Sequence, residues 1–393
     1  MGIFKQAILN EKEDILPYFY FLAETKCIGI KTYQRMQSYF GSPKMLFEAP
    51  VSRIEKTGIF SKSQIEKIVR CRNTFKPDMM YENIRKAGIS VIPYDAPEYP
   101  IKLKEIKDPP AVLFLKGKMP LAEFPCVSVI GARECSRYGA NVAARLGELF
   151  AATDIALISG MARGVDSISQ KACIDSGGYS LAFLGGGVDI CYPKEARPLY
   201  NGLCERGGLL SEFAPGTANE PHFFALRNRL ISGFSDVVCV VEAREKSGTM
   251  ITVECALDQG KDVYAVPGRI TDSTSVGTND LIRQGACIVT DLDAFCDEIV
   301  NNFSLKGGRA ANKTVKEIVS VPLTRGEEAV VANMDENSFT AEQLSDFTSL
   351  PAYELLTICL SLTTKGILTS MGGGRFTPTP YGIELRNHMI VTI

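Results

Sequence analysis

The segment Cys126-Val-Ser-Val-Ile130 runs directly into Gly131-Ala-Arg-Glu-Cys-Ser136, so a short apolar stretch is followed by a glycine turn. The stretch is largely apolar on both faces, as in a parallel strand that is covered by helices on either side. Residues 155–158, 180–184 and 236–241 repeat this pattern, and helical periodicity follows their glycine turns. The alternation predicts an α/β fold with a Rossmann-like, doubly wound, mostly parallel sheet.

Changes in pattern along the chain predict four segments. Residues 1–80 show no strand-like alternation and predict a small helical domain of the helix-hairpin-helix or SAM-like kind. Residues 81–300 hold the predicted Rossmann-like domain, and the polar stretch 301–314 is expected to be a linker. Residues 315–393 predict two helices and a β-hairpin, which is a winged-helix-like pattern.

Both terminal domains leave a choice of roles. Gly58 is expected at a left-handed turn between two helices, with Ser61 or Ser63 as the next N-cap. Such a turn could offer N–H groups to a DNA phosphate, but small helical bundles without a ligand use the same signals. In the last domain, the expected second helix has Lys365 as its only base. This favours protein interaction or a structural role over reading of the DNA major groove.

The composition gives no global support for nucleic-acid binding. The 393 residues include 43 Lys and Arg against 45 Asp and Glu, and the net charge is −2. Any DNA-binding site must therefore be a local basic surface. No signal peptide and no apolar run of about 20 residues is found, which predicts a cytoplasmic protein outside the membrane. With His222 and His388 as the only histidines, and no Cys-x-x-Cys pair, no metal site is expected.

Four glycine turns follow strands of the predicted sheet and are expected at one edge, where ligands of such sheets bind. Glycine lets the backbone approach an anion, and N–H groups of the next helix point at it. The residues expected to bind DNA or its phosphates are Gly131, Arg133 and Ser136 in the first turn, Gly160, Arg163 and Gly164 in the second, Gly186 and Tyr192 in the third, and Lys246, Ser247, Gly248 and Thr249 in the fourth. The alternative for any one turn is a tight connection with a capped helix.

A further candidate is the run Arg227, Asn228 and Arg229 in the helix expected before strand 236–241. Guanidinium and amide groups suit phosphate oxygens and base edges. The alternative is internal ion pairing with Glu212 or Asp236. Tyr192 and Phe223 are candidates for base stacking, with a core role as the alternative.

A nucleotide cofactor is not expected. The fingerprint Gly-x-Gly-x-x-Gly is matched by Gly185 and Gly187, but position 190 is isoleucine. A phosphate-binding loop of the Walker type is also absent from the sequence.

The collinear segments Val129-Ile-Gly-Ala-Arg133, Ser159-Gly-Met-Ala-Arg-Gly-Val-Asp166, Arg227-Asn-Arg-Leu-Ile-Ser-Gly233 and Ala265-Val-Pro-Gly268 resemble the DNA-processing protein A (DprA/Smf) family. The resemblance covers residues 90 to 290. It implies a non-enzymatic protein that binds single-stranded DNA without sequence preference, handles incoming DNA in natural transformation, and promotes loading of the RecA recombinase. It also implies a homodimer through the Rossmann-like domain.

The same resemblance implies phosphate contacts for Gly131, Arg133, the segment 227–229 and the turn 247–249. Ala132 stands where the family has Ser or Thr, and Leu226 where many members have a base. The alternative function is nucleotide cleavage, because Ser247-Gly-Thr249 with Glu254 is similar to the site of the lysine-decarboxylase-like (LOG) phosphoribohydrolases. The Pro-Gly-Gly of those enzymes is here replaced by Arg244-Glu-Lys246.

Overall fold

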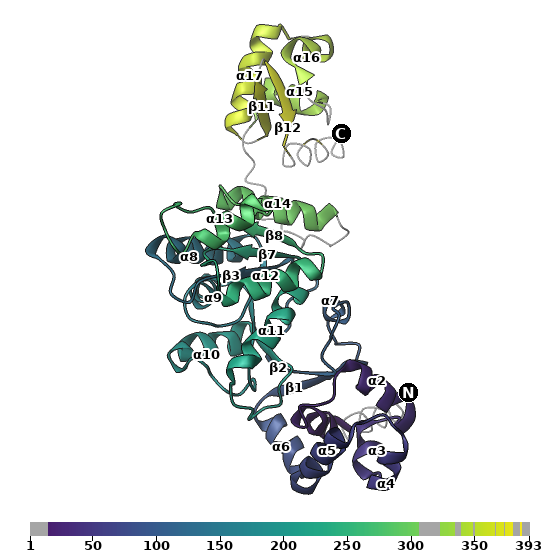
Figure 1. The fold of residues 1–393 in the computed structure, drawn as a ribbon. Coiled ribbons are helices and arrows are strands. Elements are labelled where there is room, and N and C mark those ends of the chain that lie inside the picture. Colours follow the sequence, from purple (N-terminus) through teal and green to yellow (C-terminus); the bar gives the residue numbers. More distant parts are fainter. Residues whose placement is uncertain are drawn as a thin grey trace, which may run out of the picture. The chain divides into compact units, whose positions relative to one another are not determined.

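The computed structural model divides into two compact units, Met1–Ala311 and Asn312–Ile393 (Figure 1). It describes residues 15–305, 323–334, 339–348, 350–365, 367–372, 374–379 and 386. The division between the units falls within the stretch 301–314 predicted as a linker, although helix α14 (Leu292–Leu305) extends into that stretch.

The first unit begins with a helical module, residues 15–86. Its helices are residues 15–24, α2 (Ile30–Phe40), α3 (Pro43–Glu48), α4 (Val51–Lys56), α5 (Lys62–Thr74) and α6 (Pro77–Lys86). The predicted turn is confirmed, because Gly58 has φ +61° and Ser61 caps α5 in a capping box with Gln64. Phe21, Tyr33 and other fully buried side chains form the core of the module.

A nine-stranded sheet follows, in the order β1-β2-β6-β5-β4-β3-β7-β8-β9. The strands are β1 (Ile89–Pro93), β2 (Val112–Gly117), β3 (Cys126–Ile130), β4 (Ala156–Ser159), β5 (Ser180–Phe183), β6 (Gly208–Ser211), β7 (Val237–Val240), β8 (Asp262–Ala265) and β9 (Cys287–Ile288). From β6 to β9 all neighbours are parallel, while β1 and β2 add two antiparallel pairings at one end. The predicted mostly parallel sheet is confirmed, and β6 is a strand that the sequence analysis did not predict.

Helices cover both faces of this sheet, as the doubly wound prediction requires. They are α7 (Ile101–Lys104), α8 (Arg137–Ala152), α9 (Val165–Asp175), α10 (Arg197–Arg206), α11 (Pro221–Phe234), α12 (Gly248–Asp258), α13 (Val276–Arg283) and α14, with a short 3-10 turn η1 (Lys194–Ala196). Apolar residues of α8, α9 and α14 form one buried cluster with the strands. Those of α7, α11, α12 and α13 form another. Strand β3 is buried along its whole length between the two.

The second unit has its own core, built from three helices and a small antiparallel sheet of order β10-β12-β11. Its elements are α15 (Arg325–Asn333), β10 (Phe339–Thr340), α16 (Ala341–Thr348), α17 (Ala352–Thr364), β11 (Leu368–Gly372) and β12 (Arg375–Pro378). The two helices and the hairpin expected from the sequence are present, and the winged-helix-like role of the unit stays a prediction. Across the described parts of both units, none of the helices combines the length and the apolar character needed to cross a bilayer.

Candidate nucleic-acid interface

The centre of the site is the switch point of the sheet, where β3 and β7 are parallel neighbours and the chain leaves them in opposite directions. The turns after both strands meet there, since the Thr249 hydroxyl donates to the Gly131 carbonyl at 3.1 Å. A Cβ on Gly131 would lie 2.7 Å from Val165 and 3.0 Å from the Glu242 carbonyl oxygen. Glycine is therefore needed at position 131 because the second and fourth turns press against it.

Glu242 is a buried carboxylate in this crevice that the sequence analysis did not single out. It follows β7 directly and is 2% exposed. It accepts hydrogen bonds from the Ser136 amide at 2.8 Å and the Ser136 hydroxyl at 2.6 Å, and from the Thr274 hydroxyl at 3.3 Å. A buried carboxylate needs such donors to offset its lost hydration. Ser136 is thus occupied internally, as the N-cap of α8 and as a donor to Glu242, rather than free for a phosphate.

Arg227 lies under the second turn instead of at the surface. Its side chain is buried, and Nη1 donates to the Phe183 carbonyl at 2.5 Å. Burial lowers the pKa of Arg227 to about 10, against the opposing effect of Asp166 and together with the repulsion from Arg133. A Cβ at Gly160 would overlap the guanidinium, which explains glycine at that position. Arg227 therefore packs against the second turn at Gly160 and bonds to the end of β5.

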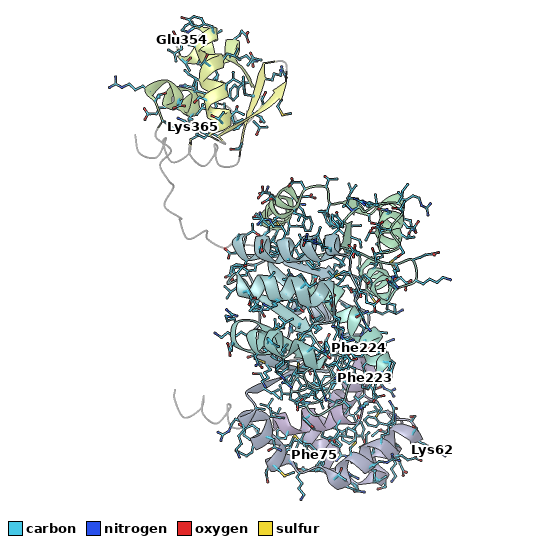
Figure 2. The ribbon with its side chains drawn as sticks, turned by 90° about the vertical axis from the view of Figure 1, so that its left-hand side faces the viewer. Lys62, Phe75, Phe223, Phe224, Glu354 and Lys365 are labelled. Atoms are coloured by element: carbon cyan, nitrogen blue, oxygen red, sulfur yellow. The ribbon has the colours of Figure 1, made fainter. Side chains whose placement is uncertain are left out.

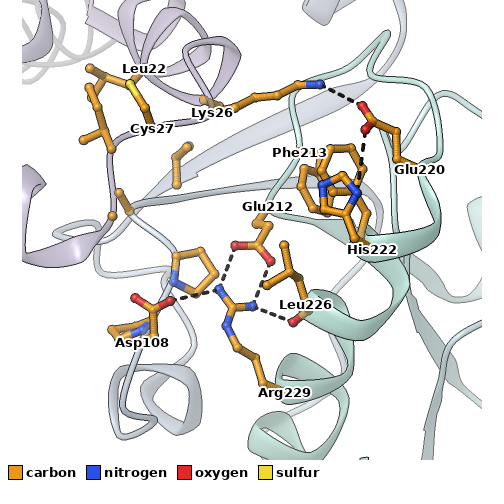
Figure 3. A pocket seen from close by; sticks show the side chains of 18 of the residues that line it. Leu22, Lys26, Cys27, Asp108, Glu212, Phe213, Glu220, His222, Leu226 and Arg229 are labelled. Atoms are coloured by element: carbon orange, nitrogen blue, oxygen red, sulfur yellow. Dashed lines mark hydrogen bonds and ion pairs between the residues drawn. The ribbon is translucent and has the colours of Figure 1, made fainter. Parts of the chain in front are cut away.

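The two residues after Arg227 point in other directions, because successive helical residues are rotated by about 100°. Arg229 forms a bidentate pair with Glu212, with N–O distances of 2.7 and 2.8 Å, and lies 3.9 Å from Asp108 (Figure 3). For Arg229, the structure therefore supports the internal ion pair with Glu212, which was the alternative to a phosphate contact. Asn228 faces α12 and donates to the Gly248 carbonyl at 3.4 Å.

Three other side chains form a row at the carboxyl edge, which we call the edge row: the exposed Arg133 and Tyr192, with the half-buried Phe224 between them. The Arg133 guanidinium lies 5.8 Å from the centroid of the Phe224 ring. The rings of Phe224 and Tyr192 are 5.4 Å apart with an interplanar angle of 32°. Tyr192 is 51% exposed and Arg133 is exposed as well. The row therefore presents a cation and the Tyr192 ring to solvent, with the half-buried Phe224 ring between them.

Of the two stacking candidates taken from the sequence, Phe223 lies in the core, which was the alternative for it. It is 5% exposed and stacks on Phe213 at 4.2 Å. Its neighbour Phe224, labelled beside it in Figure 2, makes the contacts with Arg133 and Tyr192 instead. Helical phase could have shown this, because Phe223, Arg227 and Leu230 share the buried face of α11.

The remaining predicted residues divide into packing positions and exposed groups. Gly164 has φ +77° and packs on the Ala132 carbonyl, while a Cβ on Gly186 would lie 2.7 Å from Asn219. Arg163 and Lys246 are exposed, and Arg163 pairs loosely with Glu195 at 3.4 Å. At the start of α12, Gly248 is exposed, and Ser247 is an N-cap whose side chain makes no capping hydrogen bond.

The turn at Gly58 offers little to a DNA phosphate. The amides of Thr57 and Gly58 donate to carbonyls of α4, the Ile59 amide donates to the Thr57 hydroxyl, and the Ser61 amide donates to Gln64. Since these donors are already used, the structure favours a small helical bundle without a ligand at this turn.

The position of Glu254 does not fit the nucleotide-cleaving alternative. Glu254, which an enzyme of the phosphoribohydrolase kind would need, is exposed on α12, and the carboxylate inside the crevice is Glu242. Among the described residues, no group of three or more His, Cys, Asp or Glu side chains could hold a metal ion.

Fold and site together define a Rossmann-like protein whose switch point carries cations and aromatic rings. In dinucleotide-binding proteins a phosphate binds at the N-terminus of the first helix, and here the Glu242 carboxylate occupies that place at α8. The sequence model of the family described as DNA recombination-mediator protein A matches residues 90–300. The chain belongs to this family.

Individual relatives and structures agree with this assignment. DNA processing protein DprA of Streptococcus pneumoniae is 39% identical over 192 residues, which cover 49% of this chain and 68% of the relative. Protein Smf of Escherichia coli is 32% identical over 288 residues, which cover 72% and 76%. The X-ray structure of the S. pneumoniae protein matches with a TM-score of 0.62 at 29% identity, covering 72% of this chain and 97% of that one. DNA processing protein A of Helicobacter pylori, described for its single-stranded DNA binding mode, matches with a TM-score of 0.50 at 27% identity, covering 55% and 96%.

Proposed function

We propose that the chain binds single-stranded DNA, without sequence preference, along the carboxyl edge of its parallel sheet. The observation that carries this proposal is the edge row of Arg133, Phe224 and Tyr192. A strand presents phosphates and unstacked bases at short intervals, and the row offers a guanidinium beside two rings. Stacking on aromatic side chains tolerates any base, because every base has a π-face.

The phosphate site next to this row is at α12 rather than α8. Glu242 occupies the α8 terminus through Ser136. The α12 terminus has the exposed Gly248, with Lys246 exposed in the preceding turn. A helix N-terminus with free amides and a nearby cation attracts an anion. A strand that follows this edge would place a phosphate at α12 and bases on Phe224 and Tyr192.

The wider role follows from the family. We propose a non-enzymatic, cytoplasmic protein that handles incoming DNA in natural transformation and promotes RecA loading. The description of the family as a recombination mediator and the single-stranded DNA binding mode of the H. pylori protein support this. Nucleation of RecA on strands coated with single-strand-binding protein, with and without this chain, tests the loading step, and equal rates would contradict it.

We also propose a homodimer through the Rossmann-like domain. Strand β9 ends the sheet order, and the apolar side chain of its Ile288 is 51% exposed. Open sheet edges with apolar side chains are natural pairing surfaces. Light scattering of the wild type and of Ile288→Lys tests this, and a monomeric wild type would contradict it.

Fluorescence anisotropy with a labelled oligothymidylate and a matched duplex, over a salt series, tests the DNA-binding proposal. We expect tighter binding of the single strand, because only unstacked bases reach the rings. Arg133→Ala should weaken binding and reduce the slope of log affinity against log salt by about 0.7. Arg206→Ala is the matched control, because Arg206 is exposed at the end of α10, where the chain enters β6 at the opposite edge. Equal affinity for both DNAs, or equal effects of both substitutions, would refute the proposal.

A further inference from the structure

The loop between β6 and α11, residues 212–220, which we call the linking loop, is tied to the turn that carries Tyr192. The Gly216 amide donates to both carboxylate oxygens of Asp189, at 2.9 and 3.0 Å. The Gly187 amide donates to the Thr217 carbonyl at 2.9 Å. These bonds fix the third glycine turn against the linking loop.

The helical module holds the same loop from the other side. The Tyr20 hydroxyl donates to the Pro215 carbonyl at 2.7 Å. The Lys26 ammonium lies 3.6 Å from a Glu220 carboxylate oxygen and 5.0 Å from the centroid of the Phe223 ring (Figure 3). Lys26, Glu220 and Phe223 line a cavity of about 580 Å³. The module therefore touches the linking loop and the first turn of α11 together.

The linking loop and the edge row meet at the start of α11. Phe213 and Phe223 stack at 4.2 Å and close the linking loop at its two ends. Phe224 is the next residue along the helix and contacts Arg133 and Tyr192. Neighbouring residues of a helix move as one body, so a rotation of the first turn that shifts Phe223 also shifts Phe224.

We propose that the helical module positions the base-stacking rings of the edge row, with Tyr20 and Lys26 as the positioning residues. This inference rests on the proposed single-stranded DNA binding. Tyr20 fixes the linking loop, and Lys26 holds the first turn of α11 through Glu220 and the face of Phe223. Neither side chain belongs to the edge row. Arg133 meets Phe224 only at 5.8 Å, and the first glycine turn that carries it is anchored to Val165 and Thr249. The module therefore acts mainly on the contribution of the bases and much less on that of the phosphates.

Anisotropy with two single strands of equal length, an oligothymidylate and an abasic phosphodiester, separates the two contributions. Tyr20→Phe removes only a hydroxyl, and Lys26→Met keeps most of the side-chain volume. Complete loss of one stacked base would weaken binding about fivefold or more, and a displaced ring loses only part of its stacking, so we expect each change to weaken oligothymidylate binding about threefold to fivefold. Abasic binding and the salt slope should stay at wild-type values.

The matched control is Lys62→Met, on an exposed lysine that begins α5 of the same module (Figure 2). It should leave both affinities unchanged. The inference is overturned if Tyr20→Phe and Lys26→Met both match the wild type, or if they weaken abasic binding as strongly as oligothymidylate binding. A wild type that binds neither strand would instead refute the proposed function, so the two failures are distinguishable.

Discussion

Gly160→Ala tests the burial of Arg227 beneath the second glycine turn. The added Cβ would lie 2.5 Å from the Arg227 Cζ atom and 2.6 Å from Nη2. The guanidinium cannot retreat, because the side chain is 4% exposed and Nη1 is bound to the Phe183 carbonyl. Overpacking costs about 1–3 kcal/mol and loss of a hydrogen bond from a charged group about 1.5–3 kcal/mol. We therefore expect a loss of about 3–5 kcal/mol, or roughly 6–15 °C in Tm.

A double-mutant cycle with Arg227→Met identifies the cause. Methionine is flexible and can yield to the new Cβ, so the double variant should lose about 2 kcal/mol less than the sum of the single losses. Urea and thermal unfolding measure all four proteins. Gly248→Ala is the control, because no atom lies within 4 Å of a Cβ there, and its stability should not fall. Additive losses, or a Gly160→Ala protein with the wild-type Tm, would show that Arg227 does not occupy this space.

Three further predictions concern charged groups. Glu242→Gln should lower the free energy of unfolding by about 1–3 kcal/mol, which thermal unfolding measures. It should also tighten single-strand binding in anisotropy, because a negative charge is removed from the crevice. Arg229→Met should lower Tm with little change in DNA affinity. Arg133→Met should weaken DNA binding with little change in Tm. Burial alone would raise the pKa of Glu327, but hydrogen bonds, led by that of Lys365, lower it to about 2. A depressed carboxyl pKa stabilises the second unit above pH 4 to 5 and ceases to do so as pH falls toward 2, which calorimetry over that range should show. Lys365→Met should remove part of this stabilisation, about 1–3 kcal/mol at neutral pH, because Thr324 and Ser361 still donate to the carboxylate.

The sequence was sufficient for most of the sheet because buried parallel strands are apolar on both faces. The expected stretch 126–130 coincides with β3. Strand β6 was missed since Gly208-Leu-Leu-Ser211 is short and follows another glycine, so it has no strand-like signal of its own. The antiparallel pairing of β1 and β2 also lay beyond prediction, because periodicity shows which residues are buried and not the direction of the neighbouring strand.

The site was predicted at the level of turns and less well at the level of side chains. The four turns follow parallel strands, so their place at one edge follows from topology. What a side chain does depends on helical phase and on long-range partners. Arg227 and Arg229 are close in sequence, yet one lies under Gly160 and the other pairs with Glu212. Glu242 was overlooked because its partner Ser136 is 106 residues away.

The chain has a net charge of −2, yet its proposed ligand is an anion, because basic side chains are gathered at the four turns. The number of these side chains limits how strongly the DNA affinity can depend on salt. The four turns carry four exposed cations: Arg133, Arg163, Arg244 and Lys246. Arg163 and Arg244 have surface carboxylates at 3.4 and 3.7 Å, in weak pairs that a phosphate can replace. At about 0.7 per phosphate, the slope of log affinity against log salt should not exceed about 3. The rest of the affinity must then come from stacking on Phe224 and Tyr192. A measured slope of about 5 would require phosphate contacts on another surface and would refute this division of the binding energy.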